Sequence, residues 1–277
     1  MPGDRLTLRP VTPALGAEVS GIDLARPLDD DLRDEVLRAL DAHLVLFFRD
    51  QPITPAQQLA FATRFGEVSV APFGPKDAAN PDITVLDQRS PKGEGADSWH
   101  TDNTFMPNPP FASILRGELI PPLGGDTCWA NTFLAYEGLS APIRQLIDGL
   151  SAVHDLTKML TKAIEIGKSN ADLHEMQQRW PPMHHPVVRT HPVTGRKALF
   201  VNRNWTTRIE GLGEREGEAL LNLLCDQMLV PDYQVRLRWS AGTVAFWDNR
   251  WVQHYAVPDY TDRRVMCRVT LAGDRPR

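Results

Sequence analysis

The tripeptide His100-Thr101-Asp102 carries the side chains in this sequence that are best suited to chemistry. On an extended segment, residues two apart point to the same side, so the imidazole and the carboxylate can converge on one point. One further histidine would complete the set of two histidines and one carboxylate that binds Fe(II) and leaves three coordination positions open. The tripeptide alone is weak evidence, because such short patterns arise by chance.

The third ligand has to come from the other seven histidines. His43 opens an apolar strand and is expected to be a core or edge residue. Five more lie in the polar, proline-rich middle of the chain, where solvated or structural roles are expected: His154, His174, His184, His185 and His191. His254 differs, because it directly precedes a predicted strand that carries two arginines.

Those arginines, Arg264 and Arg268, are four residues apart and therefore face the same side of a strand, together with Met266 and Thr270. Two guanidinium groups on an inward face need anions to pair with. One interpretation is surface ion pairing on an edge strand. The other is a pocket that holds two anionic groups beside a metal ion.

Several common catalytic patterns are absent from the sequence. It contains no G-x-S-x-G, no G-x-x-x-x-G-K-[ST] and no H-E-x-x-H, and the glycines at 211, 213 and 217 do not have dinucleotide-binding spacing. Serine hydrolase, nucleotide hydrolase and Rossmann dehydrogenase functions are therefore not indicated.

Charge and composition exclude other classes of function. In 277 residues, 30 Lys and Arg stand against 35 Asp and Glu, a net charge of −5 that argues against a nucleic-acid partner. No signal peptide is visible, the strongly apolar stretch Leu44–Phe48 is too short to span a bilayer, and the three cysteines lack paired spacing. We expect a reduced cytoplasmic protein with no membrane partner.

The elements that must position these residues are mostly strands. Hydrophobic spacing and caps predict helices over 30–42, 54–66, 142–149 and 214–229. Short strands separated by Pro and Gly turns are predicted over 6–9, 43–48, 83–87, 112–119, 127–130, 198–202, 234–239, 243–247, 252–256 and 264–271. This irregular order favours an antiparallel sandwich or barrel with flanking helices. The polar segment 157–182 is predicted to be a lid or insert, although disorder would also fit.

Several separated motifs, in order, resemble the taurine dioxygenase family of Fe(II)- and 2-oxoglutarate-dependent oxygenases. They are His100-Thr101-Asp102, Gly124-Gly125-Asp126-Thr127, Trp247-Asp248-Asn249-Arg250 with His254, Arg264 with Arg268, and the stretch 185–202. The resemblance runs nearly end to end. It implies one domain over residues 1–277, folded as a double-stranded β-helix (jelly roll), mainly β with flanking helices.

The resemblance also implies roles for individual residues. His100, Asp102 and His254 would be the iron ligands and the catalytic centre. The co-substrate 2-oxoglutarate would chelate the iron, with Arg264 and the Thr127 hydroxyl binding its distal carboxylate. With O2, the enzyme would hydroxylate a C–H bond of a small anionic substrate and release succinate and CO2.

The substrate pocket departs from the taurine-specific pattern. Ala71, Gly74 and Ala96 stand where taurine enzymes have a His, a Tyr and an Asn. Asn103 and Trp205 replace an apolar residue and a Phe, and Leu160 would also line the pocket; packing of a loop is the alternative role for Trp205. Because each lost hydrogen bond costs about 1–3 kcal/mol, taurine should bind poorly.

Arg268 preserves the expectation of a carboxylate, sulfonate or sulfate ester as substrate. Two alternatives remain: a non-catalytic relative that binds 2-oxoglutarate and metal, and a metal-dependent isomerase or hydrolase on a similar barrel. The second leaves Arg264 and Thr127 without a role. A homo-oligomer, dimer or tetramer, is expected from the resemblance.

Overall fold

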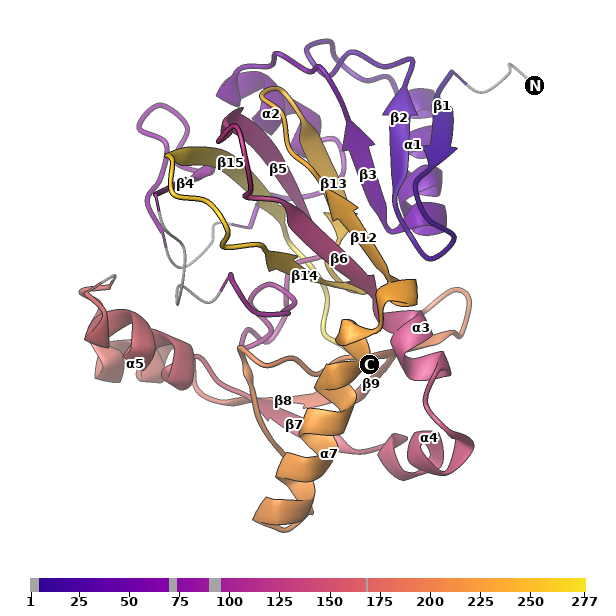
Figure 1. Ribbon diagram of the computed structural model, residues 1–277, viewed down its shortest axis with the longest axis vertical. Coiled ribbons are helices and arrows are strands. Elements are labelled where there is room, and N and C mark those ends of the chain that lie inside the picture. Colours follow the sequence, from indigo (N-terminus) through magenta and orange to yellow (C-terminus); the bar gives the residue numbers. More distant parts are fainter. Residues whose placement is uncertain (1–4, 70–73, 90–95, 168) are drawn as a thin grey trace.

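A computed structural model describes residues 5–69, 74–89, 96–167 and 169–277, which form a mainly β structure with flanking helices (Figure 1). The largest sheet has seven strands, paired antiparallel except for β2 and β3. Their order across the sheet is β1 (Thr7–Pro10), β2 (Ala17–Ser20), β3 (Val45–Phe48), β13 (Val244–Asp248), β5 (Ala112–Leu119), β15 (Arg264–Leu271) and β4 (Thr84–Gln88). Because β15 lies between β5 and β4, an edge-strand position for its two arginines is wrong.

A three-stranded sheet packs against one face of the large sheet. It consists of β12 (Gln234–Leu237), β6 (Thr127–Asn131) and β14 (Val252–Ala256), with β6 in the middle. Trp129 from β6 and Leu237 from β12 share a core with Phe47, Trp247 and Met266 of the large sheet. The alternation of side chains along each strand therefore produces a sandwich, with its apolar filling between the two sheets.

Two helices, α1 (Asp30–His43) and α2 (Pro55–Ala62), cover the other face of the large sheet (Figure 1). Asp29 caps α1 by accepting a hydrogen bond from the Leu32 amide. The predicted capping box of Thr54 and Gln57 is confirmed at the start of α2. This helix ends at Ala62, before the expected stop at Gly66.

The remaining elements pack below the sandwich around a third apolar cluster. The predicted helix over 142–149 is α4 (Ala141–Ile147), and the one over 214–229 divides into α7 (Glu214–Asp226) and the 3-10 turn η1 (Gln227–Leu229). The others are α3 (Thr132–Glu137), η2 (Pro231–Tyr233), a sheet of β11 (Thr206–Ile209), β7 (Ser151–His154) and β8 (Met183–Pro186), and a pair of β10 (Lys197–Leu199) and β9 (Val188–Thr190).

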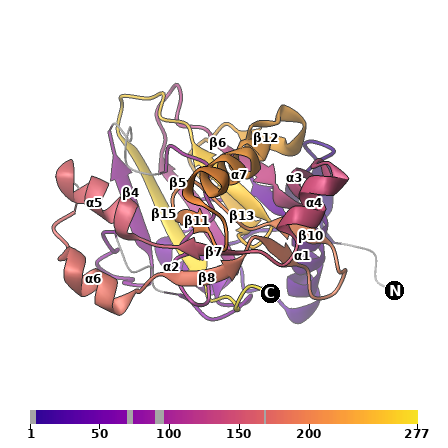
Figure 2. The ribbon, with the colours of Figure 1, turned by 90° about the horizontal axis from the view of Figure 1, so that it is seen from below.

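The polar segment 157–182 contains two helices, α5 (Thr157–Glu165) and α6 (Leu173–Arg179). They lie on the opposite side of the molecule from α3 and α4 (Figure 2). Leu160 of α5 is buried in a small cluster with Phe105 and Trp205. All three cysteines are free and buried. No helix in the described ranges is long and apolar enough to cross a membrane.

Candidate metal and anion site

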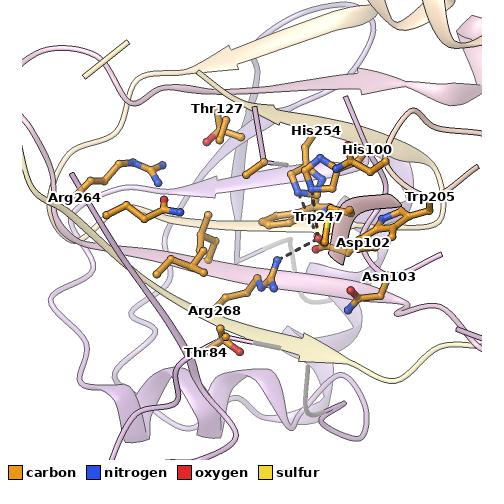
Figure 3. Close-up of a pocket in the computed structure, with 18 residues that line it drawn as sticks. Thr84, His100, Asp102, Asn103, Thr127, Trp205, Trp247, His254, Arg264 and Arg268 are labelled. Atoms are coloured by element: carbon orange, nitrogen blue, oxygen red, sulfur yellow. Dashed lines mark hydrogen bonds and ion pairs between the residues drawn. The ribbon is translucent and has the colours of Figure 1, made fainter. Parts of the chain in front are cut away.

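Two backbone segments bring His100, Asp102 and His254 together (Figure 3). His100 and His254 form an isolated β-bridge in which each amide donates to the other's carbonyl, at 3.0 and 2.8 Å. The Nε2 atoms of both imidazoles lie 3.7 Å from the same oxygen of Asp102, Oδ1. One potential ligand atom from each residue lies within 4.8 Å of the others, so a single ion can reach all three.

The Nε2 atoms of both histidines face this point. Nδ1 of His100 lies 2.8 Å from the Ser98 carbonyl oxygen, so Nδ1 carries the proton and Nε2 is left as an acceptor. Burial, with repulsion from His100, lowers the pKa of His254 to about 3. A neutral imidazole is the form that binds a metal ion.

Asp102 supplies the negative charge of the cluster. Its burial alone would raise its pKa, but the Arg268 guanidinium and the two histidines lower that pKa well below its usual range. Arg268 Nη1 lies 3.1 Å from Oδ1, and the Ser113 hydroxyl donates to Oδ2 at 3.1 Å. The carboxylate is therefore ionised and held in one orientation.

Asn249 fixes the backbone beneath the cluster. Its side-chain oxygen accepts from the Asp102 amide at 3.0 Å, and its nitrogen donates to the carbonyls of Asp102 and Pro110. The next residue, Asn103, has a φ of 51°, in the left-handed region that a non-glycine residue rarely adopts. The loop that carries Asp102 therefore turns sharply, and hydrogen bonds with Asn249 anchor it to the end of β13.

Arg264 lies at the other end of the cavity and is 4% exposed. Its Nε and Nη2 atoms have no hydrogen-bond partner among the described residues, which is costly for a buried cation. Trp239 Nε1 donates to the Thr127 hydroxyl at 2.9 Å, so the Thr127 proton is available to another acceptor. A carboxylate placed between Arg264 and Thr127 would satisfy these donors.

One cavity of about 220 Å³ connects both ends of the site. Of the residues predicted from sequence, His100, Asp102, Asn103, Thr127, Trp205, His254, Arg264 and Arg268 line it, as do Gly74 and Ala96. Leu160 is buried in an apolar cluster with Trp205 and does not line the cavity, whereas its neighbour Met159 does. Ala71 lies outside the described residues. Trp205 also donates from Nε1 to the Thr101 carbonyl at 3.0 Å, so it contacts both the cavity and the metal-binding segment.

Some residues of the cavity wall were not predicted from the sequence. Thr84, Leu86 and Gln88 line the cavity from β4, and Leu115 and Trp247 line it from β5 and β13. The spacing of two along β4 could have indicated one inward face, but the pairing of β4 with β15 was not deducible from that pattern. Ser113 and Asn249 act through Asp102 and have no motif of their own outside the resemblance.

Comparison with known proteins agrees with this geometry. The sequence model of the family described as "Taurine catabolism dioxygenase TauD, TfdA family" matches residues 7–270. The chain belongs to this family. An alkylsulfatase of Acinetobacter baylyi is 39% identical, over 99% of this chain and 87% of the relative. An alpha-ketoglutarate-dependent sulfate ester dioxygenase of Pseudomonas putida is 39% identical, over 98% of this chain and 91% of the relative.

The family likeness extends to three dimensions. The crystal structure of a taurine dioxygenase from Burkholderia xenovorans superimposes with a TM-score of 0.84 and 38% identity, covering 99% of this chain and 93% of the other. Four of the five motifs that indicated the family from sequence contribute residues to the cavity, whereas the stretch 185–202 does not line it.

Proposed function

We propose that this protein is an Fe(II)- and 2-oxoglutarate-dependent oxygenase that hydroxylates a small organic anion and releases succinate and CO2. The observation that carries the proposal is the cavity itself. It joins two imidazoles and a carboxylate at one end to the buried Arg264 at the other, whose Nε and Nη2 atoms have no hydrogen-bond partner among the described residues. Family membership and the names of the relatives, which include a sulfate ester dioxygenase dependent on alpha-ketoglutarate (2-oxoglutarate), support the same reaction class.

The donor set fits the metal ion. His100, Asp102 and His254 would hold Fe(II), because neutral imidazole nitrogens and one carboxylate suit this ion and leave positions for other ligands. When bound, iron with 2-oxoglutarate and O2 supplies the oxidising power that no amino-acid side chain provides. Ser113 and Asn249 would keep Asp102 in the orientation that the ion requires.

Binding and orientation of the co-substrate fall to the opposite end of the cavity. The planar guanidinium of Arg264 would pair with the distal carboxylate, and the Thr127 hydroxyl would donate a further hydrogen bond. Gly125 leaves room for this arginine, because a Cβ there would stand 3.1 Å from Arg264 Cδ. Trp239 holds the Thr127 hydroxyl in place by donating to it.

The substrate would bind next to Asp102, where Arg268 offers a positive charge. Arg268, whose side chain is 17% exposed, forms the wall of the cavity on this side together with Asn103, Trp205 and Met159. These residues would hold the anion and exclude water from the reacting carbon. The similarity to an alkylsulfatase and to a sulfate ester dioxygenase favours a sulfate ester or sulfonate as the substrate of this protein. Gly74 and Ala96 offer taurine no side-chain hydrogen bond, so taurine should be a poor substrate.

A screen of anions tests the function. Alkyl sulfates, sulfonates, aryloxyalkanoates and amino acids would each be supplied with Fe(II), 2-oxoglutarate and O2, and succinate would be measured. We expect turnover with at least one anion, only when Fe(II) is present, and weak turnover with taurine. Tight binding of 2-oxoglutarate without oxygen consumption for any anion would instead favour a non-catalytic relative. Taurine turnover equal to that of the best anion would contradict the pocket argument.

We also propose that the two packed sheets constitute a double-stranded β-helix in one domain spanning residues 1–277, with α5 and α6 as a lid over the cavity. The shared core of the two sheets and the position of Met159 in the wall support this arrangement. A homo-oligomeric state stays a prediction, which light scattering would test.

A further inference from the structure

A row of three polar side chains crosses the sheet at the substrate end of the cavity. In the antiparallel pair of β15 and β4, Arg268 lies directly opposite Thr84. On the other side of Thr84, an isolated antiparallel bridge pairs it with Lys76. Directly opposite residues of adjacent strands have their side chains on the same face of the sheet. Arg268 and Thr84 both line the cavity, so Lys76 is the next side chain in that row.

The backbone around the bridge brings Lys76 and Thr84 especially close. Hydrogen bonds from the Val85 amide to the Pro75 carbonyl and from the Asp77 amide to the Ile83 carbonyl flank the pair on both sides. Lys76 and Thr84 are therefore a non-hydrogen-bonded pair, in which opposing side chains come closest. The Lys76 ammonium donates to the Thr84 hydroxyl oxygen at 3.0 Å.

The orientation of the Thr84 hydroxyl follows from its neighbours. Gly74 packs against the Thr84 methyl group so closely that a Cβ on the glycine would stand 3.1 Å from it. Because the methyl group faces Gly74 and the oxygen accepts from Lys76, the hydroxyl proton is left to donate elsewhere. Thr84 is buried and lines the cavity beside Arg268, as Figure 3 shows.

We propose that Thr84 donates a hydrogen bond to the anionic head of the substrate beside Arg268, and that Lys76 is the positioning residue that directs this hydroxyl and adds positive charge behind it. This inference rests on the proposed function and assigns two more residues to its substrate subsite. Arg268 Nε has no hydrogen-bond partner among the described residues, so the subsite offers a second donor on the same wall. Burial and the proximity of Arg268 lower the pKa of Lys76. A bound oxyanion would raise this pKa again.

Anion binding to the Fe(II)- and 2-oxoglutarate-loaded protein without oxygen tests the proposal by calorimetry. Hexyl sulfate, hexane-1-sulfonate and phenoxyacetate would be titrated into the wild type, and the tightest would be used for the variants. Thr84→Val, which keeps the shape but removes the hydroxyl, should weaken binding about tenfold or more. Lys76→Met should weaken it about three- to tenfold. Thr84→Ser and Lys76→Arg should recover most of the affinity.

Two controls separate binding from structure. Lys197→Met removes the same charge from a lysine that pairs with Asp148 and does not line the cavity, so it should bind the anion like the wild type. The Kd of 2-oxoglutarate should be unchanged in all variants. In turnover, the Thr84→Val and Lys76→Met variants should raise KM for the anion and leave kcat nearly unchanged, because the lost contact belongs to binding.

The outcomes are distinguishable. Wild-type affinity for the anion in both Thr84→Val and Lys76→Met would overturn this inference and leave the proposed function intact. An equal loss of 2-oxoglutarate affinity in these variants would also overturn it, because the effect would then be structural. If the wild type binds none of the three anions, the proposed function fails for this substrate class and the inference fails with it.

Discussion

Replacing Arg264 with methionine should abolish tight binding of 2-oxoglutarate without weakening the fold. In the absence of a ligand, this buried guanidinium has two nitrogen atoms with no partner in the described part of the chain. Burial lowers its pKa, which reflects the free-energy cost of keeping the charge there. Methionine is flexible and can pack between the rings of Trp239 and Tyr260, whose centroids lie 5.9 and 5.7 Å from the guanidinium carbon.

The expected loss of affinity for 2-oxoglutarate follows from the number of hydrogen bonds that the Arg264→Met substitution removes. A carboxylate that bridges Nε and Nη2 makes two charge-assisted hydrogen bonds, each with a net value of about 1.5–3 kcal/mol. Losing both at the lower value corresponds to a Kd for 2-oxoglutarate that is about 100-fold higher or more. The free energy of unfolding without 2-oxoglutarate should be equal to or higher than in the wild type, because the substitution removes a buried charge with two unpaired nitrogen atoms in the described part of the chain.

Anaerobic unfolding of the Fe(II)-loaded protein, with and without 2-oxoglutarate, measures both quantities. At a 2-oxoglutarate concentration of about 100 times the wild-type Kd, the wild type should gain about 2.7 kcal/mol of stability. A variant with a 100-fold weaker Kd should gain about 0.4 kcal/mol at the same concentration. Arg263→Met is a matched control, because that arginine is half-exposed and pairs with Asp87 outside the cavity.

Two results would refute the reasoning. A stabilisation by 2-oxoglutarate in the Arg264→Met variant that equals that of the wild type would show that the distal carboxylate binds elsewhere. A large drop in stability without 2-oxoglutarate would show that Arg264 is satisfied within the folded protein and is a structural residue.

Three further predictions concern the residues around the site. Ser113→Ala removes the hydrogen bond to Asp102 Oδ2 and should weaken Fe(II) binding about tenfold in an equilibrium titration. An unchanged affinity for Fe(II) would mean that Arg268 and Asn249 suffice to orient Asp102. Trp205→Phe removes the hydrogen bond to the Thr101 carbonyl and should lower the free energy of unfolding by about 1 kcal/mol in a denaturant titration. An unchanged free energy of unfolding would mean that Trp205 serves only to line the cavity. Burial lowers the pKa of His154 well below 6.5, so the unfolded chain takes up a proton below that pH that the folded protein does not. The metal-free protein should therefore lose stability as pH falls below 6.5, with His154 contributing up to about 1.4 kcal/mol per pH unit; a His154→Gln variant with an unchanged slope would contradict this.

Local sequence patterns predicted the parts of the site that depend on strand geometry. The spacing of Arg264 and Arg268 places both on one face of β15, and both line the cavity. His100 and Asp102 also line the cavity, but Asp102 lies in a turn and not on the extended segment that the spacing predicted. The cap of Thr54 and Gln57 likewise predicted the start of α2, because a capping box is made within four residues.

Features that depend on distant pairing could not be predicted in this way. The place of β13 between β3 and β5 brings together residues about 200 and 130 positions apart, and no local pattern encodes that order. Asn249 reaches Asp102 only because β13 ends beside the loop that carries it. The sequence analysis did not predict α5 and α6, because the two helices are only nine and seven residues long and lie in a polar segment.

Metal binding by Asp102 variants tests the central claim most directly. The wild type should bind one Fe(II) per chain in an anaerobic equilibrium titration, and Asp102→Ala should bind none at the same concentrations, with succinate formation lost as well. Asp226→Ala, which removes a carboxylate that pairs with Arg203 at the end of α7, should behave like the wild type. Stoichiometric Fe(II) binding and full succinate formation by the Asp102→Ala variant would contradict the assignment of this cluster as the iron site.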